Sequence, residues 1–154
     1  MPVEIRHAVA EDMPRAQEFY VERQYGGGIG PEDAVLLAER DGELVGIVRL
    51  VPEQGVTLLR GMQIHPSVQR QGLGKRLLVA VAHRLGNDAC FCIPYAHLVD
   101  FYGGIGFVPI APANAPSFLR SRLEGYQRRG DGQQYLLMYR KGLPGSQVYA
   151  EHPI

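Results

Sequence analysis

Net charge, long apolar runs and cysteine are all scarce in this sequence of 154 residues. The charges of sixteen basic and sixteen acidic residues cancel, so the sequence shows no excess of positive charge that would attract nucleic acids or anionic membranes. No apolar run approaches the length of a membrane span, and residues 1–6 lack the apolar core of a signal peptide. We therefore expect a cytoplasmic protein whose partners include neither nucleic acid nor membrane.

Only two cysteines are present, Cys90 and Cys92, and they share one short apolar run. On a strand they would point to the same face, and they are too close in sequence for an unstrained disulfide. No second pair of cysteines or histidines has the spacing of a metal-ligand set. The sequence therefore predicts buried, reduced thiols and no metal.

A glycine-bearing stretch at residues 69–78 is the most informative part of the chain. It follows residues 58–66, which are typical of a strand, and it opens a helical pattern that Gly86 and Asn87 close. A helix start after a strand presents free N–H groups and a positive dipole end, which bind phosphate. Gly72 and Gly74 lack a Cβ, so an anion can approach the backbone closely.

Two common phosphate-binding motifs do not fit this stretch. A Walker A loop needs a glycine where Gln69 stands and a serine or threonine where Arg76 stands. A dinucleotide-binding fingerprint needs a third glycine in place of Leu77. The residues that remain, Gln-x-x-Gly-x-Gly, would by themselves also suit a glycine-rich turn with no ligand.

Hydrophobic patterning predicts a mixed α/β fold with a meander of three strands before the phosphate-binding stretch. Asp41-Gly42 predicts a tight hairpin turn, and residues 52–55 predict a second turn. Residues 25–31 suit either a flexible flap near a substrate site or an ordinary loop, and the tail after residue 142 is expected to fray. We expect strands at residues 3–6, 34–39, 44–51, 56–64, 89–93, 106–110 and 134–140, with helices beginning near Asp12 and covering residues 73–85, 95–103 and 118–129.

Five motifs in this order resemble the GCN5-related N-acetyltransferase (GNAT) superfamily, and together they span residues 3–140. They are Ile5-Arg6-x-Ala8 with Asp12, Ala38-Glu39-x-Asp41-Gly42-x-x-Val45-Gly46, Ile64-His65-Pro66, Gln69-x-x-Gly72-x-Gly74 and Phe101-Tyr102-x-x-x-Gly106-Phe107. The resemblance implies one domain over residues 1–154, with a twisted mixed sheet of six to seven strands flanked by helices. Residues 56–64 should run parallel to residues 89–93, because the helix between them is a crossover.

The resemblance also implies a site for acetyl-CoA, which would serve as co-substrate. The main chains of Met62 and Ile64 would bind the pantetheine arm and help to polarise the thioester carbonyl. Arg70 and Lys75 would add charge, with solvated helix-end residues as the alternative. The pyrophosphate would lie on the backbone of Gln69, Arg70, Gln71, Gly72, Leu73, Gly74 and Lys75.

Tyr102 is the catalytic residue that the resemblance implies, as the proton donor to the leaving CoA thiolate. The alternative is a packed core aromatic, because Leu98 and Phe101 share its helical spacing. The chain departs from the family in two places: Leu58 stands where a glutamate base is common, and Tyr95 where an asparagine often binds pantetheine. Weaker candidates for a base are His65, His97, Asp100, Glu39 and Glu43, and a water relay to solvent or an acceptor with a lower pKa would also serve.

The sequence therefore predicts an N-acetyltransferase that moves an acetyl group from acetyl-CoA to a primary amine of a small molecule or peptide. Direct attack in a ternary complex is the expected mechanism. The alternative is a non-catalytic acyl-CoA-binding sensor of the same fold, which the missing base at Leu58 favours. Whether the chain forms a homodimer stays open.

Overall fold

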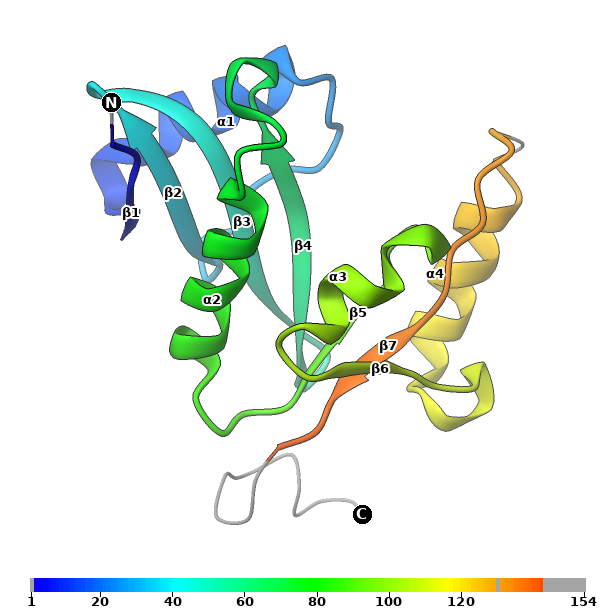
Figure 1. Ribbon diagram of the computed structural model, residues 1–154. Helices are drawn as coiled ribbons and strands as arrows, with labels where there is room; N and C mark the ends of the chain where they lie inside the picture. The colour runs from blue at the N-terminus through cyan, green and yellow to red at the C-terminus, as the bar shows by residue number, and fades with distance from the viewer. Residues whose placement is uncertain (1, 130, 143–154) are drawn as a thin grey trace. The chain divides into compact units, whose positions relative to one another are not determined.

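The computed structural model describes residues 2–129 and 131–142 (Figure 1). These residues form two compact units: the first contains the described chain up to Gln54 and Leu58–Arg84, and the second contains Gly55–Thr57 and the described residues from Leu85 onward. Seven strands make up the sheet, which confirms the expected mixed α/β fold. Within the described residues, no helix is long and apolar enough to cross a membrane. The tail expected to fray lies outside these residues.

The first unit consists of four strands and two long helices. The strands follow the order β1 (Glu4–His7), β2 (Ala34–Arg40), β3 (Glu43–Glu53) and β4 (Val56–Ile64), and β1–β2 and β2–β3 pair antiparallel. Helix α1 (Met13–Glu22) follows a short 3-10 turn at Ala10–Asp12, and helix α2 (Leu73–Leu85) follows another at Pro66–Val68. The helix after the phosphate-binding stretch therefore has the bounds that the sequence predicts.

Two hairpin turns join β2 to β3 and β3 to β4. Asp41 and Gly42 have φ values of 55° and 80°, and Gln54 and Gly55 have 49° and 85°, as in the turns that suit twisted strands. The second turn is shorter than the expected span of residues 52–55, because β3 continues through Pro52. The β2–β3 ladder ends at the Ala34–Leu50 pair, so the N–H that Pro52 lacks costs no bond to β2.

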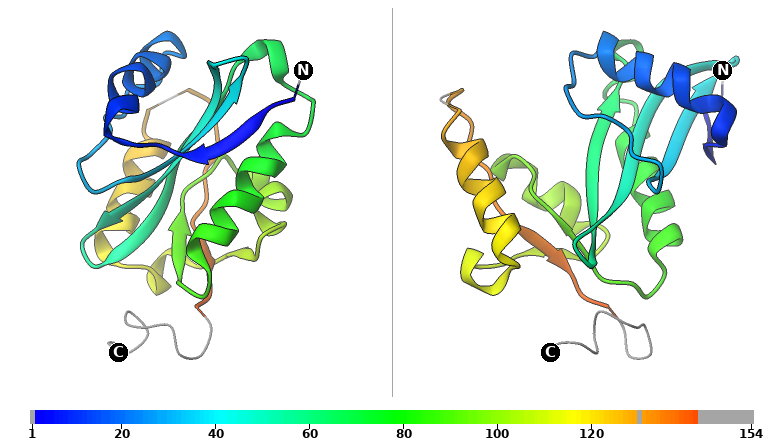
Figure 2. Two further views of the ribbon diagram at one scale, coloured as in Figure 1. Left: turned by 90° about the vertical axis from the view of Figure 1, so that its left-hand side faces the viewer. Right: turned by 180° about the vertical axis from the view of Figure 1, so that it is seen from behind.

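The two helices of the first unit cover opposite faces of its strands (Figure 2). Side chains alternate along a strand, so the residues that face α1 are next to those that face α2. Gly46 faces α2, where an added Cβ would lie 3.2 Å from a methyl of Leu77 and 3.3 Å from one of Leu73. The missing side chain thus lets the start of α2 pack close to the sheet. The core on the α1 side contains Ala16, Phe19, Tyr20, Val35, Leu37 and Ile47.

The second unit places three short strands beside two helices. Strands β5 (Cys90–Cys92) and β6 (Phe107–Pro109) both pair antiparallel with β7 (Met138–Arg140), in the order β5-β7-β6, and the helices are α3 (Val99–Gly103) and α4 (Ser117–Gln127). Strand β7 is shorter than the expected residues 134–140, because Tyr135 makes only an isolated bridge to Tyr95. The single domain and the parallel run of residues 56–64 with 89–93 involve both units and stay predictions.

Both cysteines are free and buried, as the sequence predicts. They lie on β5, and burial raises the pKa of the Cys92 thiol. Across residues 2–129 and 131–142, no group of three or more histidine, cysteine, aspartate or glutamate side chains is placed to hold a metal ion.

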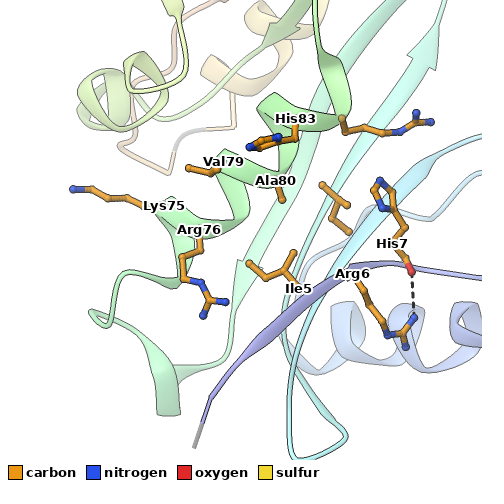
Figure 3. Close-up of a pocket in the computed structure, with 10 residues that line it drawn as sticks. Ile5, Arg6, His7, Lys75, Arg76, Val79, Ala80 and His83 are labelled. Carbon is orange, nitrogen blue, oxygen red and sulfur yellow. Dashed lines mark hydrogen bonds between the residues drawn. The ribbon is translucent and has the colours of Figure 1, made fainter.

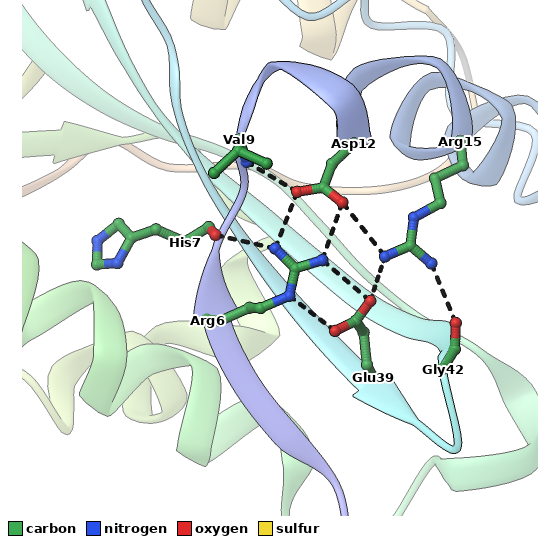
Figure 4. A network of polar contacts seen from close by, with 7 residues as sticks. All are labelled: Arg6, His7, Val9, Asp12, Arg15, Glu39 and Gly42. Atoms are coloured by element: carbon green, nitrogen blue, oxygen red, sulfur yellow. Dashed lines mark hydrogen bonds and ion pairs between the residues drawn. The ribbon is translucent and has the colours of Figure 1, made fainter.

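A network of charges ties β1, β2 and α1 together (Figure 4). Arg6 donates to both carboxylate oxygens of Asp12 at 2.8 Å and to Glu39 at 2.8 and 3.1 Å. Arg15 pairs with the same two carboxylates and also donates to the Gly42 carbonyl at 3.1 Å. The Arg6 guanidinium holds the pKa values of Asp12 and Glu39 below their usual range.

We expect this network to make the free energy of unfolding sensitive to acid. The pKa of Asp12 is lower in the folded chain than in the unfolded chain, so below about pH 5 the unfolded state binds more protons and stability falls. Asp12→Asn should be less stable than the native protein at pH 7 but should lose less stability between pH 5 and pH 3. Urea unfolding at a series of pH values measures both effects.

A matched control is Asp88→Asn, at an exposed position outside the network, which should follow the acid profile of the native protein. An Asp12→Asn profile with the native slope would show that this carboxylate does not contribute to the acid response.

Candidate functional site

The phosphate-binding stretch leaves its backbone open at the start of α2. Gly72 has a φ of 80°, and a Cβ added there would meet nothing within 4 Å, so the backbone conformation rather than crowding requires glycine. The N–H of Arg76 donates to the Gly72 carbonyl at 3.2 Å. The helix itself supplies no acceptor for the N–H groups of its first turn, including those of Leu73, Gly74 and Lys75. Free N–H donors at the positive end of a helix dipole are the kind of groups that bind anions.

Side chains of the same stretch donate to carbonyl groups of the residues just before it. The Gln69 amide donates to the Ile64 carbonyl at 3.0 Å, and the Gln71 amide donates to the Ser67 carbonyl at 3.4 Å. Arg70 adopts a φ of 67°, and Val68 is buried beneath the turn. The turn that leads into the stretch is thus held by bonds to the Ile64 and Ser67 carbonyls. Gln69 holds the end of β4, a role that the sequence reading did not give to its side chain.

His65 and Glu39, two of the weaker base candidates, are committed to structural contacts. The His65 Nδ1 accepts a hydrogen bond from the Ser67 N–H at 3.0 Å and so caps the turn at Pro66–Val68. Glu39 is ion-paired with Arg6 and Arg15, and Arg6 lowers its pKa. Leu58, where the family often has glutamate, lies in the core with 3% of its surface exposed.

Strand β4 bends immediately before Met62. Gly61 has a φ of 71°, and its carbonyl accepts a hydrogen bond of 2.8 Å from the Tyr20 hydroxyl. A Cβ on Gly61 would lie 2.4 Å from that hydroxyl oxygen, so any other residue would displace Tyr20 and be strained by the positive φ. Met62 and Ile64, the expected pantetheine contacts, follow this bend and are half-buried.

The glycine loop, which we define as residues 25–30, contains no helix or strand, as expected, but hydrogen bonds hold it. Arg49 on β3 donates to the Gly28 carbonyl and pairs with Asp33 at 2.9 Å. Asp33 also accepts from the Gly30 N–H at 2.8 Å, and Gln17 accepts from the Ile29 N–H at 3.1 Å. Sequence reasoning missed Arg49 and Asp33. The signal in the sequence that could have indicated a buried polar contact was Arg49, the single arginine within an otherwise apolar strand.

Tyr102 lies in the second unit, on α3, with 6% of its surface exposed. Its ring packs edge to face against Phe101 and Phe107, at centroid distances of 5.0 and 6.3 Å. This packing is what a core aromatic would show, and its role as proton donor stays a prediction. Tyr95 is 39% exposed and stacks on His97, one of the other base candidates.

A cavity of about 750 Å³ lies between β1 and α2 in the first unit (Figure 3). Its apolar lining includes Ile5 and Val79, and its basic lining includes Arg6, Arg76 and Lys75. Arg6 is already neutralised by two carboxylates, and Arg76 donates to the Val3 carbonyl at 2.7 Å. Lys75 belongs both to this cavity and to the phosphate-binding stretch.

Solved acetyltransferase structures share this fold. The ribosomal-protein-S18-alanine N-acetyltransferase from Escherichia coli has a TM-score of 0.67 and 17% identity, with 96% of this chain and 99% of that chain covered. N-acetylglutamate synthase from Neisseria gonorrhoeae, in complex with coenzyme A and N-acetyl-glutamate, has a TM-score of 0.63 and 20% identity. The match covers 93% of this chain and 36% of that chain. A GNAT family acetyltransferase from Elizabethkingia anophelis with acetyl-CoA bound has a TM-score of 0.59 and 16% identity, with 90% of this chain and 97% of that chain covered.

Sequence comparison assigns the family. No curated protein matches the chain in sequence. The family model for the acetyltransferase (GNAT) domain matches residues 6–117, which is well over half of the chain and includes the bend at Gly61, the phosphate-binding stretch and Tyr102. The chain therefore belongs to the GNAT acetyltransferase family.

Proposed function

We propose that this protein transfers the acetyl group of acetyl-CoA to a primary amine by direct attack in a ternary complex. The observation that carries the proposal is the open backbone at Gly72, where the first turn of α2 offers N–H donors to a pyrophosphate. Two structures of the same fold hold coenzyme A or acetyl-CoA, which supports this choice of donor. Lys75, in the same turn, would add a positive charge beside the phosphates.

The end of β4 would hold the pantetheine arm and the thioester. The Gln69 side chain already occupies the Ile64 carbonyl, and the group that we propose meets the thioester is the Met62 N–H. An N–H aimed at the thioester oxygen would stabilise the negative charge that develops there as the amine attacks. Fixed donors of this kind typically contribute a few kcal/mol.

In the reaction, the amine nitrogen bonds to the thioester carbon, the carbon–sulfur bond breaks, and the thiolate takes a proton. Tyr102 is the proposed donor of that proton. The attacking amine must also lose a proton, and Leu58, Glu39 and His65 are unsuited to accept it, as their contacts show. The remaining base candidates, His97, Asp100 and Glu43, are all exposed, and we propose that the proton leaves through water.

Without a dedicated base, the pKa of the acceptor amine becomes important. A lysine-like amine with a pKa near 10.4 has a cost of about 4.6 kcal/mol to be neutral at pH 7, whereas an α-amine with a pKa near 7.8 has a cost of about 1 kcal/mol. A peptide α-amine or a weakly basic small amine is therefore the favoured acceptor class. The similarly folded S18-alanine N-acetyltransferase is named for an alanine acceptor in a protein.

A non-catalytic acyl-CoA sensor is the second candidate, and the buried Leu58 favours it. A panel of small primary amines and short peptides with free α-amines separates the two functions. Release of CoA from acetyl-CoA with any acceptor supports the enzyme. Tight CoA binding with no release across the whole panel supports the sensor.

We expect Gly74→Glu to lower the affinity for CoA at least tenfold, which is about 1.4 kcal/mol. The change adds a carboxylate to the first turn of α2, where the pyrophosphate would bind, and it avoids the positive φ that would complicate a change at Gly72. Isothermal titration calorimetry measures the dissociation constant, and circular dichroism checks the fold.

Arg84→Glu is the matched control, because it adds a carboxylate near the other end of the same helix, in the cavity beside β1. That position lies about 15 Å along the helix axis, beyond the Debye length of about 8 Å at physiological salt. Its CoA affinity should stay within about twofold of the native value. If the native protein and folded Gly74→Glu bind CoA with equal affinity, the pyrophosphate does not bind at the start of α2.

Tyr102→Phe should lower kcat by about a hundredfold or more while the Kd for acetyl-CoA stays within about twofold. The change keeps the ring that packs against Phe101 and Phe107 and removes only the hydroxyl. Steady-state rates with an acceptor from the panel, together with calorimetry, separate the two quantities.

Tyr135→Phe is the control, because it removes an exposed hydroxyl that bonds Asp131 at 3.3 Å in the same unit. Its kcat should remain within about twofold of native. If Tyr102→Phe also keeps nearly full kcat, Tyr102 is a core aromatic and the thiolate takes its proton from water.

A further inference from the structure

The Tyr20 hydroxyl is the polar end of one of the most deeply buried side chains in the first unit. Tyr20 lies on α1 with no exposed surface, and its hydroxyl donates to the Gly61 carbonyl on β4 at 2.8 Å. Burial raises the pKa of this phenol, so it keeps its proton at neutral pH and remains a donor. A buried hydroxyl needs such a partner, and here the partner is the bent backbone of Gly61.

This hydrogen bond fixes the orientation of one peptide unit. The Gly61 carbonyl and the Met62 N–H belong to the same planar peptide, and no cis peptide is present in the described residues. In a trans peptide the carbonyl and the N–H point in opposite directions. A carbonyl held toward Tyr20 therefore directs the Met62 N–H away from α1.

Arg49 supports Tyr20 from the neighbouring strand. Its guanidinium carbon lies 5.3 Å from the centroid of the Tyr20 ring, within the range of a cation–π contact. Only 2% of Arg49 is exposed, and its charge is balanced by Asp33 at 2.9 Å. The Arg49 Nε lies 3.2 Å from the position that a Cβ on Gly61 would occupy, so Arg49 packs against the bend itself.

Arg49 also holds the glycine loop. It donates to the Gly28 carbonyl, and its partner Asp33 accepts from the Gly30 N–H. One buried side chain thus contacts the glycine loop, Tyr20 and the bend in β4. Because burial of an unpaired charge is costly, the Arg49 and Asp33 side chains depend on each other, and removal of either leaves the other charge uncompensated.

From these contacts we infer that Tyr20 and Arg49 are positioning residues that orient the Met62 N–H toward the thioester carbonyl of the acyl donor and couple that orientation to the glycine loop. Neither residue touches a reacting atom; both act through the Gly61–Met62 peptide. The inference rests on the proposed function and names the residues that select the acetylated form of the donor.

The test compares acetyl-CoA with CoA, because CoA carries no thioester carbonyl. In the native protein the Met62 N–H should favour acetyl-CoA over CoA. Tyr20→Phe keeps the ring and removes the hydroxyl, so it should raise the Kd for acetyl-CoA about three- to tenfold, as expected for loss of one hydrogen bond, and the Kd for CoA less than twofold. Calorimetry measures both constants and needs no acceptor amine.

Arg49→Lys is the second variant. It keeps a positive charge beside Asp33 but replaces the planar guanidinium that lies over Tyr20 and reaches Gly28. We expect Arg49→Lys to raise the Kd for acetyl-CoA and to leave the Kd for CoA nearly unchanged. In the combined Tyr20→Phe/Arg49→Lys variant, the increase in the Kd for acetyl-CoA should be smaller than the product of the two single increases, because both residues act on one peptide. Tyr135→Phe, outside this cluster, should leave both dissociation constants unchanged.

The outcomes separate this inference from the function on which it rests. Native protein that binds neither CoA nor acetyl-CoA contradicts the proposed function and the inference together. Native binding of both, with variants that weaken CoA and acetyl-CoA equally or weaken neither, contradicts the inference alone. If Tyr20→Phe does not fold and Arg49→Lys keeps the native ratio of the two constants, the cluster stabilises the core and does not position Met62.

Discussion

The candidate site depends on backbone N–H groups that α2 cannot pair within itself. Every helix begins with such groups, and they are usually satisfied by a capping side chain or by water. Here the nearby side chains of Gln69 and Gln71 donate to carbonyls instead of accepting from these N–H groups, and the backbone at Gly72 faces open space. The requirement for a hydrogen-bond acceptor at this point is what makes an anionic ligand a good fit.

Two clusters of buried or half-buried charge fix α1 to the sheet, one near each end of the helix. Asp12 and Arg15 join β1 and β2 near its start, and Tyr20 meets β4 near its end, with Arg49 beside it. Apolar packing of Ala16 and Phe19 lies between them. Apolar contacts alone tolerate small sliding movements, whereas hydrogen bonds to named atoms do not. The Tyr20–Gly61 hydrogen bond therefore links the position of α1 to the backbone of β4 just before Met62.

Local patterns in the sequence predict much of this fold, and long-range contacts account for what they miss. The apolar period from Leu73 to Leu85 defines α2, and Asp41-Gly42 defines a hairpin, because in each case the determining residues are neighbours in sequence. The extension of β3 through Pro52 depends on where β2 ends, which no local pattern records. The contacts of Arg49 with Asp33 and Tyr20 join three separate segments, and only their placement in space reveals them.

The two thiols of β5 offer a means of following the motions of the second unit. Alkylating reagents attack the thiolate, which requires both access and ionisation; burial denies access to both thiols and also raises the pKa of Cys92. Modification of Cys90 or Cys92 therefore requires a local opening that exposes β5, of which separation from β7 is one. The rate of alkylation in native buffer then reports how often β5 becomes exposed, and a cysteine introduced on the surface can be labelled without removing the native pair.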